Sequence, residues 1–194
     1  MKKIFLLLSI VIAGVTVYAQ HNSFTMSYPM ALPMGNLNDY ISATSFRGFN
    51  IEFNRRQKPN LEIGLETGWQ TFYQREDSKT YTDGSASITG VQYRYTNIAP
   101  ILAGVKFYKV SDTWSPYAGV GLGVMYVNRS TDFGLYRITT ETWPFTIRPE
   151  LGVLYHFQPG VSAMLGAKYY AAFNTNDLDG QPYLSINVGF VFTH

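Results

Sequence analysis

Apolar and polar residues alternate along residues 61–73. The odd positions are mostly apolar, as at Leu65 and Trp69, whereas the even positions are mostly glycines and polar residues, including Glu62 and Glu66. A period of two indicates a β-strand with one apolar and one polar face. Glycine weakens a strand that faces water, but a crowded interior requires small residues. The segment therefore indicates a barrel whose apolar face points outward and whose polar face points inward.

Seven further segments alternate in the same way. Transmembrane strands need ~9–11 residues, and most of the segments reach that length. The alternating segments lie at residues 24–34, 46–54, 61–73, 91–109, 116–129, 143–157, 161–174 and 183–193. The pattern predicts an all-β fold, namely an eight-stranded antiparallel up-and-down transmembrane β-barrel.

The connections between these segments alternate between short and long. Residues 55–60, 110–115 and 158–160 are short, and proline or glycine punctuates them. The longer connections are rich in Asp, Asn, Ser, Thr and Gly, and they lie at residues 35–45, 76–90, 130–142 and 176–182. Outer-membrane barrels have short periplasmic turns and longer extracellular loops. We therefore expect a surface partner, if there is one, to contact loops 35–45, 76–90 and 130–142.

The lengths of the short turns predict which residues of neighbouring strands lie opposite each other. Around Pro159, pairing Phe157 with Val161 keeps both side chains outward, and continuing that register places Glu150 opposite Lys168. A slip by one residue would put every apolar side chain on the wrong face.

The N-terminus has the features of a secretory signal peptide. Two lysines precede an apolar run over residues 4–17, and a small residue stands before Gln20. This arrangement of charged region, apolar region and small-residue cleavage site is typical of export signals. The alternative, a membrane anchor, needs ~20 apolar residues. We expect residues 1–19 to be removed near Ala19-Gln20, which leaves residues 20–194 as one barrel domain.

Charge and cysteine content exclude several classes of function. Without the two lysines of the signal peptide, the basic residues equal the 13 acidic residues in number. A basic surface for nucleic acid is therefore not indicated. The chain has no cysteine, which excludes disulfides and thiolate metal sites. Charged residues make up 14% of the chain, below the ~25% typical of soluble domains, as expected for a lipid-facing wall.

A soluble barrel of the lipocalin type is the structural alternative, because its strands also alternate. In that fold the apolar side chains point inward. Gly119, Gly121 and Gly123 would then form a bare surface facing water, which favours the transmembrane interpretation.

Aromatic residues, at 16% of the chain, gather near the ends of the segments. Membrane barrels carry aromatic girdles at both interfaces, although Tyr and Trp also favour strands in general. The residues that we expect to lie at the interfaces are Trp69, Tyr73, Tyr93, Tyr126, Trp143, Tyr155 and Phe157.

The inward-facing phase collects four acidic and four basic residues. The expected lumen charge network consists of Glu52, Glu62, Glu66, Arg94, Lys106, Arg148, Glu150 and Lys168. Charges in a narrow lumen are unfavourable unless they are paired, and eight strands enclose a space that side chains nearly fill. A salt-bridged plug is thus the first interpretation, and a gated pore is the alternative. We expect Glu52 to face Glu62, with Lys106 as the neutralising partner or with one carboxyl protonated.

The last segment, Tyr183 to His194, alternates up to a near-terminal aromatic residue. With this segment, the whole chain after the signal resembles the small bacterial outer-membrane β-barrel family of OmpX, OmpW and the OmpA transmembrane domain, and especially the barrel-domain proteins common in Bacteroidetes. The resemblance implies that the barrel-assembly machinery reads the final strand. The implied assembly signal is Leu184, Ile186, Val188, Phe190 and Phe192. Thr193 and His194 follow Phe192, whereas the family pattern often ends on the aromatic residue.

The sequence offers little chemistry for catalysis. Its histidines are His21, His156 and His194, and no Ser stands two residues after His156 as in the His-x-Ser pattern of lipid A deacylase barrels. We expect no enzyme activity, cofactor or metal site.

Three functions remain open. The first is a structural or surface-interaction barrel in the bacterial outer membrane, monomeric and surrounded by outer-membrane lipids. The second is a small pore, or an OmpW-like transporter of small hydrophobic or ionic solutes. The apolar inward positions Ile98, Pro100, Leu102, Met125 and Leu154 keep the second function open. The third is an outer-membrane enzyme.

Overall fold

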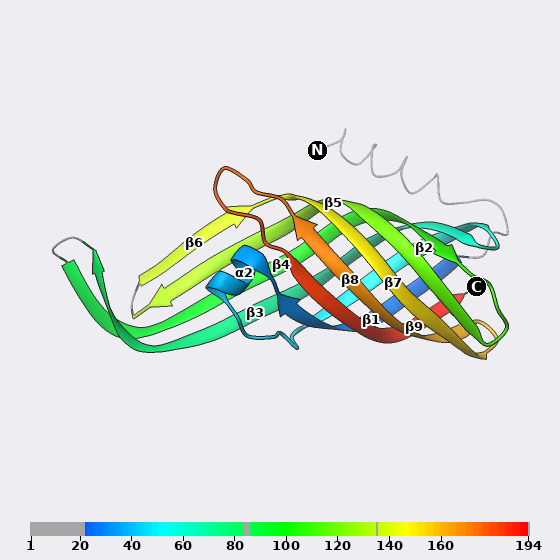
Figure 1. The fold of residues 1–194 in the computed structure, drawn as a ribbon, viewed down its shortest axis with the longest axis horizontal. Coiled ribbons are helices and arrows are strands. Elements are labelled where there is room, and N and C mark those ends of the chain that lie inside the picture. The colour runs from blue at the N-terminus through cyan, green and yellow to red at the C-terminus, as the bar shows by residue number, and fades with distance from the viewer. Residues whose placement is uncertain (1–21, 84–85, 135, 194) are drawn as a thin grey trace, which may run out of the picture.

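Alternation of side chains along the chain produces long antiparallel strands that wind around a common axis in the computed structural model (Figure 1). The structure describes residues 22–83, 86–134 and 136–193, and the side chains of 78–89 are not among the described parts. The predicted signal peptide lies outside the described residues. The elements are β1 (Asn22–Pro33), α2 (Gly35–Tyr40), β2 (Gly48–Lys58), β3 (Leu61–Asp83), β4 (Ala86–Tyr108), β5 (Trp114–Phe133), β6 (Tyr136–Thr142), β7 (Phe145–Gln158), β8 (Val161–Ala172) and β9 (Tyr183–Thr193).

The sheet closes on itself. Strands follow the order β4-β3-β2-β1-β9-β8-β7-β5, and β4 also pairs with β5. β7 pairs with residues 114–124 of β5, and β6 pairs with residues 127–133 of the same strand. β6 therefore continues the wall beyond the first residue of β7, and the two count as one strand of the barrel. Within the described residues this gives a closed eight-stranded antiparallel barrel, which confirms the predicted fold.

The two faces of the wall have the predicted polarity. Along β3, Leu65 is 62% exposed on the outer surface, whereas Glu62 and Glu66 are 2% and 3% exposed in the interior. β9 follows the same rule, with Val188, Phe190 and other apolar side chains outward and Ser185 and Asn187 buried. A barrel with apolar residues outside and polar residues inside is suited to a lipid surround rather than to water.

The register around Pro159 is mostly as predicted. Glu150 lies opposite Lys168, as expected. The expected pair of Phe157 and Val161 is wrong, because Val161 lies opposite Gln158 and the register shifts between His156 and Gln158. The irregularity is local to the turn, so the alternation of faces further along both strands is unaffected.

The long connections are more structured than the sequence suggested. Residues 76–90 were expected to form a loop, but the described residues 76–83 and 86–90 belong to the paired strands β3 and β4, and residues 130–133 and 136–142 belong to the paired strands β5 and β6. Residues 35–45 contain the short helix α2. In the sequence of both segments, polar residues occur at odd and even positions alike, as suits strands whose two faces both meet water. That composition resembles a loop, although β-branched residues and tyrosines favour strands.

The described strand ends divide into two groups (Figure 1). The short turns that follow β2, β4 and β7 gather at the end of the barrel where β1 begins and β9 ends. The two long hairpins and α2 lie at the opposite end. This arrangement matches the alternation of short and long connections in the sequence.

Interior glycines make room for large side chains from neighbouring strands. Tyr117 of β5 lies opposite Gly152 of β7, which in turn lies opposite Gly166 of β8. A Cβ atom built on Gly152 would come within 2.6 Å of the Tyr117 ring, and one on Gly166 within 2.7 Å of its hydroxyl oxygen. The row of glycines is therefore a seat for one buried aromatic ring.

We expect Gly152→Val to destabilise the barrel by about 1–3 kcal/mol, because the added methyl groups overlap the Tyr117 ring. Urea unfolding of the purified barrel, followed by tryptophan fluorescence, measures the change. Ala167→Val, on the outer face of β8, is the matched control and should leave the midpoint unchanged. Equal effects of the two substitutions would show that the fit of Tyr117 over glycine is unimportant.

Candidate functional site

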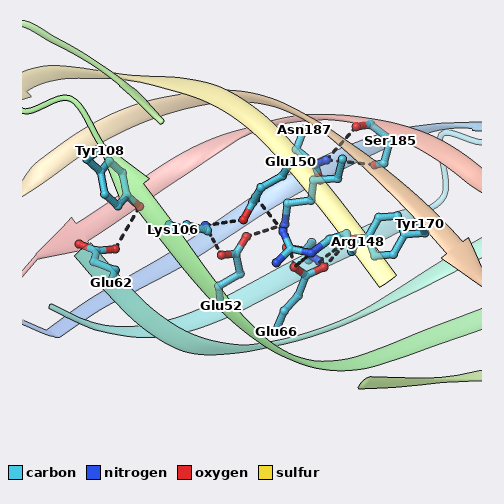
Figure 2. A network of polar contacts seen from close by, with 12 residues as sticks. Glu52, Glu62, Glu66, Lys106, Tyr108, Arg148, Glu150, Tyr170, Ser185 and Asn187 are labelled. Atoms are coloured by element: carbon cyan, nitrogen blue, oxygen red, sulfur yellow. Dashed lines mark hydrogen bonds and ion pairs between the residues drawn. The ribbon is translucent and has the colours of Figure 1, made fainter. Parts of the chain in front are cut away.

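Charged side chains from several strands meet in the interior of the barrel (Figure 2). They are buried, with at most 4% of each residue exposed. We call them the charge ring: Glu52 of β2, Glu66 of β3, Lys106 of β4, Arg148 and Glu150 of β7, and Lys168 of β8. Five of the eight barrel strands thus contribute to one layer of three acids and three bases.

The ion pairs of this layer form a closed circuit. The Lys168 ammonium contacts Glu52 and lies 3.2 Å from Glu66 Oε2, and Arg148 Nε lies 3.0 Å from the same oxygen. Arg148 Nη1 lies 2.7 Å from Glu150 Oε2. Lys106 completes the circuit, since its Nζ lies 3.8 Å from Glu150 Oε1 and also binds Glu52.

Each member of the charge ring therefore contacts two members of opposite sign. The contacts of Arg148 are close ion pairs without hydrogen-bond alignment, because its Nε and Nη1 have no hydrogen-bond acceptor in suitable geometry. The lysine contacts include aligned hydrogen bonds to Glu52 and Glu66. Mutual neutralisation is what makes burial of six charges tolerable in a narrow lumen.

Neutral side chains complete the charge ring. Asn50 donates from Nδ2 to Glu66 Oε1 at 2.8 Å and accepts from Lys168 Nζ at 2.9 Å. The Tyr170 hydroxyl donates to Glu66, and its ring stacks on Tyr183 with 4.4 Å between centroids. These contacts hold the carboxylates in place, so the layer is a rigid plug.

Two predicted members of the network lie elsewhere. Glu62 is buried nearer the short turns, where Arg56 Nη2 lies 2.9 Å away and the Tyr108 hydroxyl donates to it at 3.0 Å. The expectation that Glu52 faces Glu62 is wrong, because the turn after β2 sets a register in which Glu52 lies opposite Glu66. The expected contact between Lys106 and Glu52 is present.

Arg94 lies at the hairpin end of the barrel. Its Nη1 donates to the Tyr40 carbonyl at 2.9 Å, and its Nε donates to Gln92 at 3.0 Å. Its nearest described carboxylate is Glu76, at 3.9 Å. Arg94 therefore belongs to the mouth of the lumen and not to the charge ring.

An apolar plug fills the lumen between the charge ring and the mouth. Ile98, Leu102 and Met125, which the sequence left as possible lining of an open lumen, are buried together with Phe72 and Val127. Helix α2 and the residue after it add Leu37 and Ile41, both fully buried in this plug. A smaller cluster on the other side of the ring buries Tyr117, Leu154, Met164 and Val191.

Sequence reasoning missed the contribution of α2. The signal was present, because Leu37, Tyr40 and Ile41 are spaced as one face of a helix. The helix has only six residues, too few for a periodic pattern to stand out in a polar connection.

The predicted interfacial aromatics lie on the outer surface in two groups. Near the hairpins, Tyr73 packs against Tyr93 and Tyr95, and Tyr126 packs against Trp143. Trp69 is also exposed there. Near the short turns, Tyr155 packs against Trp114 and Phe157 against Phe190. Trp114 was missed, because it falls in a segment that the sequence assigned to a turn.

The predicted assembly strand forms β9, which pairs with β1 on one side and β8 on the other. Its outer face carries the five residues of the predicted signal, Leu184, Ile186, Val188, Phe190 and Phe192. Recognition by an assembly machinery remains a prediction.

His156 is the described residue with the most suggestive chemistry. Its Nε2 lies 2.8 Å from Ser115 Oγ, and its Nδ1 lies 2.7 Å from Ser162 Oγ. Both ring nitrogens are therefore occupied by serine hydroxyls, and no described carboxylate contacts the ring to orient it. In the part of the chain that the structure describes, no group of three His, Cys, Asp or Glu residues could hold a metal ion. Over the same residues, no helix is long and apolar enough to span a membrane.

We expect Lys168→Met to lower the free energy of unfolding by about 3–5 kcal/mol, because it leaves three buried carboxylates with only two cations, so that one negative charge is uncompensated. Lys168→Glu should destabilise the barrel further, because the ring would then hold four carboxylates against two basic groups. Gel migration before and after heating, together with urea unfolding, measures both effects. Arg137→Met removes an exposed ion pair and serves as the control, without measurable change. Unchanged stability of Lys168→Glu would refute the role of the charge ring.

Comparisons with known proteins agree with this architecture. Residues 5–192 match the family model described as "Outer membrane protein beta-barrel domain". A search of curated protein sequences finds no significant match.

Similar solved structures include Neisserial surface protein A, with a TM-score of 0.58 and 15% identity over 90% of this chain and 97% of that one. Ail of Yersinia pestis, solved with the heparin analogue sucrose octasulfate, has a TM-score of 0.52 and 10% identity, over 90% of this chain and 100% of that one. The outer membrane protease OmpT of Escherichia coli has a TM-score of 0.53 and 8% identity, over 93% of this chain and 99% of that one.

These likenesses show a shared fold, and the fold indicates the bacterial outer membrane. They leave the activity open, because one of the three is a protease. The family match covers nearly all of the barrel that the structure describes. The chain belongs to the outer membrane protein β-barrel domain family.

Proposed function

We propose that this chain is a closed outer-membrane barrel that acts through its surface rather than through its lumen. The sealed lumen supports the first half of this proposal. A solute would have to displace the apolar plug and then the charge ring, whose six charges are mutually paired. Unpairing even one buried ion pair is strongly unfavourable, so a small pore and an OmpW-like transporter are less well supported.

The second half of the proposal, action through the surface, rests on a sheet that extends beyond the barrel at the end opposite the short turns. It consists of the upper parts of β3, β4 and β5, together with β6 (Figure 1), and we call it the protruding sheet. The β3–β4 pairing continues as far as Asp83 and Ala86, and the β5–β6 pairing as far as Phe133 and Tyr136. Paired strands hold their shape, so the sheet presents a fixed surface outside the membrane.

The edge of the protruding sheet is open at β6. Among the described residues, β6 pairs with β5 on one side and with no strand on the other. Tyr136 and Ile138 are 75% and 71% exposed along it. An exposed edge with apolar side chains invites the addition of a further strand. We infer that the surface partner is a polypeptide that pairs with β6.

Two further observations bear on the alternatives. Ail shares this fold and was solved with a heparin analogue, so a barrel of this kind can bind a ligand. OmpT keeps the enzyme alternative in view. The contacts of His156 support a structural role for it, because serine hydroxyls satisfy both ring nitrogens and the orienting acid usual for a catalytic histidine is missing from its described contacts.

The purified barrel should be electrically silent in planar bilayers, because the charge ring and the apolar plug leave no continuous water path. Single-channel recording at several voltages measures this directly. A large porin reconstituted in the same way is the control for insertion. Stable conductance steps from the barrel would contradict the closed lumen and favour the transport alternative.

A photo-crosslinking residue at position 136 should give discrete adducts on living cells, because it lies on the open edge. Ile138→Lys should abolish those adducts while leaving the barrel folded, since a charge on an edge strand opposes strand addition. The same probe at Val110, exposed in a turn at the opposite end, is the matched control. The surface role of β6 fails if adducts at position 136 are absent or persist in Ile138→Lys.

A further inference from the structure

A cavity of about 420 Å³ lies at the mouth of the lumen, above the apolar plug. Its walls come from α2, β4, β5 and the connection that leads to β9. The side chains that matter here are Asn36, Asp39, Tyr40, Arg94, Arg129 and Asp179. A volume of this size falls within the range of small-ligand sites.

Two arginines share this cavity. Arg94 and Arg129 lie on the inward face of neighbouring strands, and the register places Arg129 opposite Thr96, which makes the arginines diagonal neighbours. Like charges at this separation repel each other. An anion bound between the two guanidinium groups would relieve this repulsion.

One tyrosine fixes both guanidinium groups. The Cζ atom of Arg129 lies 3.4 Å from the centroid of the Tyr40 ring, and that of Arg94 lies 5.2 Å from it. The Tyr40 hydroxyl is itself fixed, because it donates to the Ser130 carbonyl at 3.0 Å. The arginines are thus held in place before any ligand arrives, which reduces the entropy lost on binding.

The positive charge of the pair is only weakly compensated. Among the described residues, no carboxylate lies within 4.0 Å of the Arg129 guanidinium, and Glu76 approaches Arg94 only to 3.9 Å. Asp39 and Asp179 line the cavity, but neither forms an ion pair with these arginines in the described part of the chain. The cavity therefore has a basic wall and an acidic wall that do not neutralise each other among the described residues.

The two walls suit different parts of one molecule. A planar guanidinium group binds the oxygens of phosphate or sulfate through two parallel hydrogen bonds. Carboxylates and the amide of Asn36 accept or donate hydrogen bonds to hydroxyl groups. We propose that the mouth cavity binds a phosphorylated or sulfated saccharide, whose anionic group contacts Arg94 and Arg129 and whose hydroxyls contact Asp39 and Asp179.

Calorimetric titration of the full barrel in detergent tests this site, with glucose 6-phosphate and glucose 6-sulfate as probes. We expect saturable binding of both probes, and weaker binding of glucose and of inorganic phosphate. Arg129→Met should weaken the binding of glucose 6-phosphate about tenfold or more, because it removes hydrogen bonds to a charged group. Arg129→Lys should give an intermediate loss. Arg137→Met, outside the cavity, is the control and should bind as the unaltered chain does.

Each remaining outcome has a definite meaning. Glucose 6-phosphate binding that survives both Arg94→Met and Arg129→Met in barrels that still migrate as folded would overturn the site. Equal affinity for inorganic phosphate, or a preference for ethanolamine phosphate, would show that the site does not recognise the saccharide part of the ligand. Competition by added lipopolysaccharide would assign the saccharide to the membrane's own glycolipid, and lack of competition to a soluble glycan. No residue of β6 is among those that line the cavity, so this test and the crosslinking test can fail independently.

Discussion

The charge ring is the constraint on which the rest of the barrel depends. Six buried charges are tolerable only because each contacts two of opposite sign. That circuit exists only if five strands bring their side chains to one level, so it fixes the relative registers of β2, β3, β4, β7 and β8. A slip of one residue would send a ring member into lipid. The ring thus favours one set of strand registers over slipped ones.

The ring also determines what surrounds it. Side chains as large as Arg148 need space, and the glycines on neighbouring strands provide it: a Cβ atom on Gly121 would lie 2.8 Å from Arg148 Nη2. Apolar clusters on both sides keep water from the ion pairs, which strengthens the attraction between unlike charges. A lumen organised in this way is stable because it is full, and any function of the protein is then displaced to its ends and outer surface.

The sequence predicted this architecture well where one physical rule dominates. A period of two identifies the inward residues, so Glu66 and Lys168 could be assigned to the lumen without a structure. It does not say which inward charges meet, because that depends on the stagger between strands and on the reach of each side chain. Glu62 accordingly pairs with Arg56 rather than joining the ring. The protruding sheet escaped prediction for another reason: outside lipid, strands need no apolar face, and their polar pattern resembles that of a loop.

Helix α2 connects closure of the lumen with the proposed site at its mouth. Leu37 and Ile41 point into the apolar plug, while Tyr40 holds the two arginines of the cavity. One short segment therefore seals the barrel on one side and forms a wall of the site on the other. A ligand that contacts Arg94 and Arg129 would stabilise Tyr40 and, through it, the plug. Occupation of the mouth and closure of the lumen are then favourably coupled, since anything that binds the sealed form better than an open one shifts the equilibrium toward it.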